Sequence, residues 1–154
     1  MLKDVPIDEV TQLYHSTFNE AKKTLSMEDA VFMAETTKGY PFMVQLVGYY
    51  VWRKTNGAVK QSDILAGIEL AKERLGVLVF EASLNDISEK DLTFLRAMAS
   101  FEMPVSTADI QKMLDVSQGY VQQYRLRLLE TELIFSPSYG KLDFSIPYLK
   151  EYLA

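Results

Sequence analysis

The amino-acid sequence predicts a mainly α-helical fold, with a four-helix bundle in residues 1–84 and a winged helix-turn-helix in residues 85–154. Three observations lead to this fold class. Apolar residues recur at helical spacing behind helix-capping signals along most of the chain. A tight turn at Asp115–Ser117 separates two short helical patterns, as in a helix-turn-helix. Two short apolar segments flank the turn-forming stretch Ser136–Lys141, as in a β-hairpin wing.

The first two helices of the bundle are predicted from their apolar faces and their first turns. A helix from Ile7 has acids in its first turn, where the helix dipole favours them, and an apolar face of Val10, Leu13, Tyr14 and Phe18. A short second helix begins after Ser26, whose spacing to Asp29 resembles a capping box. It ends near Gly39, which suits a C-terminal cap.

The third and fourth helices complete the bundle. Pro41 favours the first turn of a third helix, where its missing amide donor costs nothing. We expect this helix to be mostly buried, with a buried side formed by Phe42, Gln45, Leu46, Tyr49 and Trp52. Ser62 and Asp63 are candidate caps of a long fourth helix, and the helical pattern breaks around residues 84–87.

The second part begins with a capping box at Ser88–Asp91 and continues as three short helices. The second of these starts at Ser106 or Thr107 after a break at Pro104, and the third runs from about Gln118 to Glu132. Residues 133–135 and 142–146 are the expected strands of the wing.

Composition excludes several classes of protein. Nearly half of the residues are apolar (48%) and a quarter are charged (24%), which is typical of a globular protein. No apolar stretch approaches the roughly 20 residues that cross a bilayer, and no signal peptide is visible, so we expect no membrane association and a cytoplasmic location.

With no cysteine and a single histidine, His15, no metal site is expected. Acid pairs such as Glu130 with Glu132 face different directions on a helix, and we find no catalytic residues.

Two segments together resemble a known family. Residues Thr37–Leu46 are similar to the Gly-Tyr-Pro pattern that starts the third lid helix in bacterial and archaeal AAA+ type ATPases related to the STAND and replication-initiator classes. The segments Val105–Ile110, Arg125–Leu129 and Ser136–Pro147 resemble the C-terminal winged helix of the same group, in the same order. The resemblance covers almost the whole chain from about Val5.

The resemblance implies the non-catalytic, C-terminal part of such an ATPase. The sequence has neither a phosphate loop nor a strand ending in paired acids for magnesium, so we expect no enzyme activity and no cofactor in this chain, with ATP bound by the parent protein. The expected partner in cis is the ATPase core. An N-terminus where the lid would begin favours a piece of a longer chain over a separately encoded protein.

The lid positions have two interpretations. Tyr40, Pro41 and Phe42 stand where many AAA+ proteins place a sensor arginine, and no arginine is present. Either Tyr40 and Phe42 pack the lid while Pro41 starts its helix, or these side chains contact nucleotide held by the core.

The winged helix also has competing interpretations. As a DNA-binding element it would place in the major groove the side chains of Ser117, Gln118, Tyr120, Gln122, Gln123 and Arg127, with Lys141 on the wing contacting phosphate. The net charge of −5, and Glu130 and Glu132 at the end of the same helix, oppose double-stranded DNA. The alternatives are a module that docks on the ATPase core or a protein partner, and a stand-alone transcription regulator that acts as a dimer.

Overall fold

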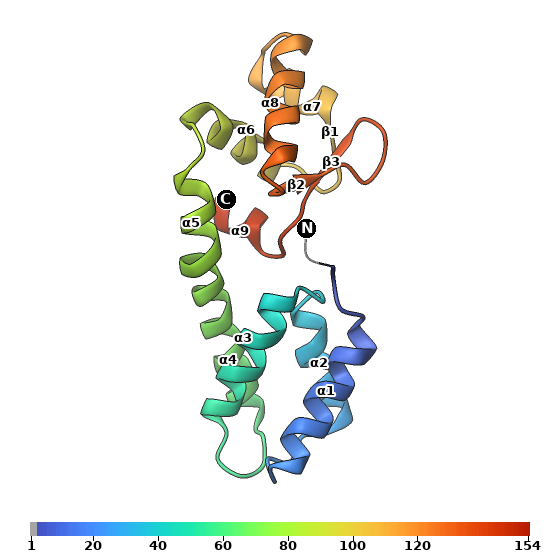
Figure 1. Ribbon diagram of the computed structural model, residues 1–154, viewed down its shortest axis with the longest axis vertical. Coiled ribbons are helices and arrows are strands. Elements are labelled where there is room, and N and C mark those ends of the chain that lie inside the picture. The colour runs from blue at the N-terminus through green and yellow to red at the C-terminus, as the bar shows by residue number, and fades with distance from the viewer. Residues whose placement is uncertain (1–2) are drawn as a thin grey trace. The chain divides into compact units, whose positions relative to one another are not determined.

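The computed structural model describes residues 3–154, and the predicted fold class is confirmed: the chain is mainly helical with a small antiparallel sheet near its C-terminus (Figure 1). The chain divides into two compact units, and the boundary between them lies between Val79 and Phe80. The sequence placed the boundary between residues 84 and 85. The short helix α5 (Glu81–Asn85) thus falls in the second unit.

The first unit, called the helical unit below, contains four α-helices whose buried faces form its core. The helices are α1 (Ile7–Glu20), α2 (Met27–Thr36), α3 (Pro41–Lys54) and α4 (Gln61–Leu75). The helices α3 and α4 pack closely against each other. A Cβ atom on Gly67 of α4 would lie 2.6–2.8 Å from atoms of Val51, so the absence of a side chain at Gly67 lets the two helices approach.

The prediction of which side of α3 is buried was wrong. The buried side chains of α3 are Met43, Val44, Val47 and Val51, whereas Tyr49 is 52% exposed. Because Val51 faces Gly67, the close packing on α4 selects this side of the helix. On α1, Leu13 is likewise 53% exposed, although Val10, Tyr14 and Phe18 are buried as expected.

The predicted cap signals of the helical unit are largely confirmed. The Ser26 side chain accepts a hydrogen bond from the Asp29 amide at 3.1 Å, and Pro41 occupies the first turn of α3. For α4, the Asp63 carboxylate accepts the amide of Lys60, the residue preceding the helix, at 2.9 Å. Ser62 lies within α4 and does not cap it.

The segment after α4 stays helical. Residues Gly76–Phe80 form a π-helical turn, and α5 ends at Asn85, where the sequence predicted a break. The helix α6 (Glu89–Ala99) begins with the predicted capping box, in which the Asp91 amide donates to the Ser88 hydroxyl at 3.1 Å.

The second unit, called the winged unit, combines α5–α9 with the sheet. After α6 come β1 (Val105–Ser106), α7 (Thr107–Leu114), α8 (Gln118–Glu130), β2 (Ile134–Phe135), β3 (Lys141–Phe144) and α9 (Leu149–Leu153). The strand order is β1-β3-β2, with both neighbouring pairs antiparallel. The sequence predicted the β2–β3 hairpin, but β1 and α9 were not predicted, because segments of two and five residues carry little periodicity.

Among residues 3–154, no helix has both the length and the apolar character needed to cross a membrane.

Candidate nucleic-acid interface

The helix-turn-helix is formed by α7, α8 and the turn at Asp115–Ser117. Asp115 closes α7 in the left-handed conformation at φ 53°, which Asp tolerates better than most side chains. Ser117 then starts α8, and its hydroxyl accepts the Tyr120 amide at 3.1 Å. The tight turn predicted from the sequence is present, and the Ser117 cap, which was not predicted, follows it directly.

The exposed side of α8 begins at its N-terminal end. Among the residues predicted to contact DNA, Ser117, Gln118 and Gln123 are exposed, and Gln122 is half-buried. A Cβ atom on Gly119 would have no neighbour within 4 Å, so the helix backbone is accessible there. Opposite this side, Val121, Tyr124 and Leu128 enter the core.

Two of the predicted residues, Tyr120 and Arg127, contact other side chains of the winged unit. The Tyr120 and Tyr124 rings are 4.5 Å apart, and the Arg127 guanidinium lies 4.6 Å from the centre of the Tyr124 ring. A side-chain hydrogen bond between the two tyrosines raises the pKa of Tyr120 and lowers that of Tyr124. Tyr120 and Arg127 thus have partners within the winged unit, whereas Gln123, which lies between them at helical spacing, is exposed.

Arg127 is engaged in an ion pair within the winged unit. Its Nη2 atom lies 2.7 Å from Oδ1 of Asp91, and its Nε atom donates to the same oxygen at 3.2 Å. A longer hydrogen bond of 3.4 Å joins Nη2 to the Ser88 hydroxyl. The hydrogen bond to Asp91 raises the pKa of the Arg127 guanidinium. The guanidinium therefore binds the start of α6, although 45% of the side chain is exposed.

Sequence reasoning did not identify Asp91, Tyr124 or Lys90 as parts of this region. Lys90 extends over the Tyr120 ring at 6.0 Å, and together with Tyr124 it lines a cavity of about 170 Å³ between α6, α7 and α8. The capping box in the sequence indicated Asp91 only as part of a helix start. Its ion pair with Arg127, 36 positions away in the sequence, depends on the packing of α6 against α8.

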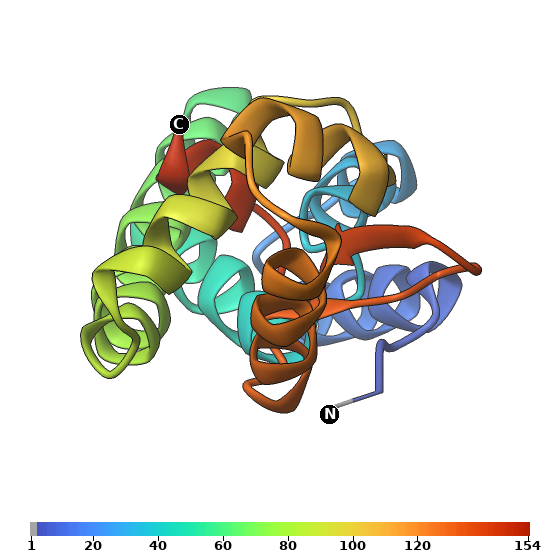
Figure 2. The ribbon, with the colours of Figure 1, turned by 90° about the horizontal axis from the view of Figure 1, so that it is seen from above.

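The wing is the loop between β2 and β3, which projects from the sheet on the side away from α6 (Figure 1, Figure 2). Lys141 begins β3 and pairs with Ser106 of β1. The Ser136 hydroxyl donates to the carbonyls of Ser138 and Lys141, both at 2.8 Å, which fixes the loop. At its tip the Tyr139 side chain is fully exposed.

Acidic side chains are absent from α8 before Glu130 and from the wing. Residues 77–154 hold 11 acids and 7 bases, yet residues 116–129 and 133–142 contain no Asp or Glu. Arg125, Arg127 and Lys141 are the cations of these two segments. Glu130 and Glu132 come after them, at the C-terminal end of α8 and just beyond it.

The lid positions of the helical unit lie at the start of α3. Pro41 occupies the first turn of α3, and Tyr40 and Phe42 are half-buried beside it. Burial, with a smaller contribution from Asp4, raises the pKa of the Tyr40 hydroxyl. Nucleotide contact by these residues stays a prediction.

Within residues 3–154, no group of three or more His, Cys, Asp or Glu side chains is arranged to hold a metal ion. His15, the single histidine, is half-buried on α1.

Comparison with known proteins places the winged unit in a family. A search of curated proteins found no match. A family model described as "Domain of unknown function (DUF8462)" matches residues 77–153, which is 77 of the 154 residues and spans α5 to α9. The chain therefore belongs to the DUF8462 family.

Proposed function

We propose that the winged unit binds double-stranded DNA, with the N-terminal half of α8 in the major groove and the wing on the phosphate backbone. The observation that carries this proposal is the exposed surface of α8, where Ser117, Gln118 and Gln123 present hydrogen-bonding side chains. Residues 116–129 contain no Asp or Glu, and the exposed Asp115 precedes them in the turn. Glutamine amides suit base edges, and the serine hydroxyl suits a phosphate oxygen.

Several features of the geometry support this assignment. The open space around Gly119 lets the helix backbone approach a groove wall. Lys141 stands at the base of the loop that would pass along the adjacent phosphates. Arg127, in contrast, supports α8 from the side of α6 through Asp91, so its contribution to DNA binding is indirect.

A titration of a fluorescently labelled mixed-sequence duplex with the full chain at low salt tests the proposal. We expect saturable binding. Gln123→Glu should weaken it at least about tenfold, because the substitution places a negative charge against the phosphates. Lys141→Ala should reduce the slope of log K against log salt concentration by about one. The control is Lys54→Ala in α3, an exposed cation of the helical unit, which should leave both quantities unchanged.

Two results would contradict DNA binding. One is the absence of binding by the natural chain together with no gain in the double variant Glu130→Lys, Glu132→Lys. The other is binding that Lys54→Ala weakens as much as Lys141→Ala, since that would indicate charge attraction without a specific surface.

We further propose that the helical unit and the winged unit form the C-terminal part of an AAA+ type ATPase, with the nucleotide bound by a core outside this chain. The helix start at Pro41 and the order of the winged-helix segments support it. The coding sequence upstream of Met1 is the direct test. An in-frame phosphate loop is expected, and a stop codon directly upstream would count against the proposal.

Protein docking is the second candidate function, and two exposed side chains favour it. Leu126 on α8 is 57% exposed, and Tyr139 at the wing tip is fully exposed. If both pack on the ATPase core or another protein, Leu126→Ser and Tyr139→Ser should abolish that complex while leaving DNA binding within about twofold.

A further inference from the structure

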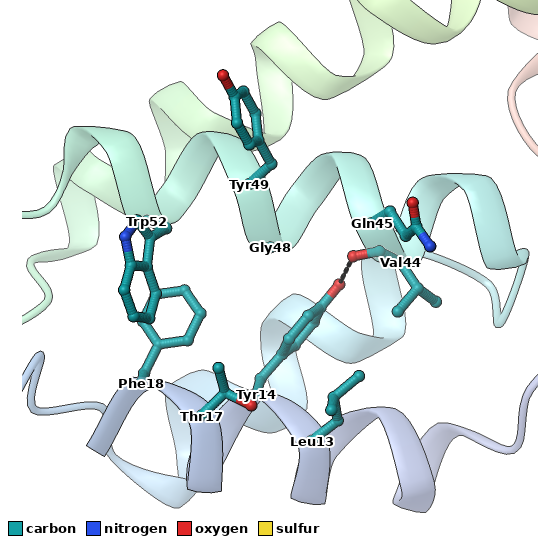
Figure 3. A pocket seen from close by; sticks show the side chains of 9 residues that line it. All are labelled: Leu13, Tyr14, Thr17, Phe18, Val44, Gln45, Gly48, Tyr49 and Trp52. Atoms are coloured by element: carbon teal, nitrogen blue, oxygen red, sulfur yellow. Dashed lines mark hydrogen bonds between the residues drawn. The ribbon is translucent and has the colours of Figure 1, made fainter. Parts of the chain in front are cut away.

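An apolar groove in the helical unit forms a site that the DNA proposal does not use. It lies between α1 and α3, has a volume of about 380 Å³, and is lined by Leu13, Tyr14, Thr17, Phe18, Val44, Gln45, Gly48, Tyr49 and Trp52 (Figure 3). This volume falls within the roughly 300–1,000 Å³ range of small-molecule sites. Two apolar residues of the groove, Leu13 and Tyr49, are about half exposed, so the groove opens to solvent.

The floor of the groove is preformed. The Tyr14 hydroxyl donates to the Val44 carbonyl at 2.5 Å, which holds the ring between the two helices (Figure 3). Gly48 faces this ring, and a Cβ atom there would lie 3.1 Å from it. Phe18 and Trp52 pack edge to face at 5.2 Å and form one end. A ligand would therefore meet a rigid apolar surface with little ordering cost.

Two cations lie beside aromatic rings that line the groove. The Lys23 ammonium lies 5.1 Å from the centre of the Trp52 ring. The Arg53 guanidinium lies 5.5 Å from the centre of the Tyr49 ring and donates to the Tyr49 hydroxyl at 2.9 Å. The Lys23 ammonium also donates to the Thr55 carbonyl at 2.9 Å, and within residues 3–154 neither cation pairs with a carboxylate. Both charges retain the capacity to attract an anion.

From this arrangement we infer that the groove binds an amphipathic carboxylate whose apolar chain lies along Leu13, Tyr14 and Val44 and whose head group lies near Arg53 and Lys23. The apolar lining selects a hydrocarbon body, and the two cations select a negative end. An amphipathic helix of a partner protein is the other occupant that such a groove accommodates, but its recognition would not require a carboxylate at one end.

The experiment uses decanoate as the probe and decanol as its uncharged match, both below the concentrations at which they aggregate. Trp52 is the single tryptophan of the chain, so its fluorescence reports occupancy of the groove directly. We expect a saturable change with decanoate and binding of decanol at least about tenfold weaker. Calorimetry on the same samples gives the affinity independently of the fluorophore.

Three variants locate the site. Arg53→Gln should weaken decanoate about tenfold and leave decanol unchanged, whereas Lys54→Gln, an exposed cation on the next residue of α3, should change neither. Thr17→Phe should block both probes, because it fills the groove from an exposed position on α1. Circular dichroism checks that each variant is folded.

Three outcomes would overturn the inference. The first is no saturable change in fluorescence or heat with decanoate. The second is equal affinity for decanoate and decanol, which would leave an apolar groove suited to a helix and no anion site. The third is an equal effect of Arg53→Gln and Lys54→Gln, because the cation over Tyr49 would then have no special role.

Discussion

The Arg127 guanidinium of α8 binds the Asp91 carboxylate of α6 at 2.7 Å and thereby fixes α8 against the helix that precedes the helix-turn-helix. Asp91 is 5% exposed and has two further roles, since its second oxygen accepts the Ser88 amide at 3.4 Å and its own amide donates to the Ser88 hydroxyl. One residue therefore starts α6 and orients α8.

The first prediction concerns this pair. Asp91→Ala and Arg127→Met should both lower the midpoint of thermal unfolding, and Asp91→Ala should lower it more, because it also removes the reciprocal capping contact of α6. Arg127→Lys should not restore the midpoint, because an ammonium cannot donate from two nitrogens while stacking on Tyr124.

Unfolding followed by circular dichroism on the two single variants and the double variant measures the coupling. Effects that are not additive are expected from two groups in direct contact. Strict additivity would show that the ion pair contributes nothing to the folded state.

The second prediction compares two helical glycines, Gly67 in the middle of α4 and Gly119 in the first turn of α8. Gly67→Ala should destabilise the chain by about 1–3 kcal/mol, because the added methyl group overlaps Val51 where α3 and α4 meet. Gly119→Ala adds the same methyl group to α8 with nothing within 4 Å, and should stabilise by about 0.5–1 kcal/mol through helix propensity. Urea unfolding of both variants tests the contrast, and a loss of stability in both would contradict the role given to open space at Gly119.

The helices and caps could be predicted because their signals are local. Ser26 and Ser88 each precede an apolar-periodic segment, and each hydroxyl accepts the amide three residues later, as the sequence predicts. The turn before α8 and the β2–β3 hairpin follow from equally local chemistry. These features depend on a few neighbouring residues, so no knowledge of packing was needed.

Features that depend on tertiary contact could not be predicted. Gln45, Tyr49 and Trp52 share the spacing of a buried helix face, but the close approach of α4 at Gly67 selects Val47 and Val51 instead. The Arg127–Asp91 pair joins residues 36 positions apart, so Arg127 was predicted only as an outward cation of α8. The apolar groove was missed for the same reason, since its aromatic lining was assigned to the core.

The third prediction follows from the buried hydroxyl of Tyr14. Burial raises the pKa of Tyr14 above its ordinary value of about 10. Above about pH 10 the unfolded chain loses this proton while the folded chain keeps it, so Tyr14 makes stability fall as pH rises through that range. Tyr14→Phe should thus give a flatter decline of unfolding free energy between pH 9 and 11.

At neutral pH the same substitution should cost about 1 kcal/mol, because it removes the hydrogen bond to the Val44 carbonyl. The control is Tyr139→Phe at the fully exposed wing tip, which should retain the steep decline of the natural chain. Parallel curves for Tyr14→Phe and the natural chain would refute the assignment.

The fourth prediction separates two costs of placing a side chain where φ is positive. Gly39 precedes α3 at φ 75°. A Cβ atom there would lie 2.4 Å from the Val5 carbonyl oxygen, which is too short for a non-bonded contact between carbon and oxygen. Gly57 has a similar φ of 82° with nothing within 4 Å. Gly57→Ala should therefore cost only the backbone strain of about 1–2 kcal/mol.

Gly39→Ala should cost clearly more, because overlap with Val5 adds to the same strain and breaks the hydrogen bond from the Val5 amide to the Gly39 carbonyl. Urea unfolding of the two variants gives the difference directly. Equal losses would mean that the segment before α1 moves aside without cost, and that the contact of Val5 with the start of α3 does not stabilise the helical unit.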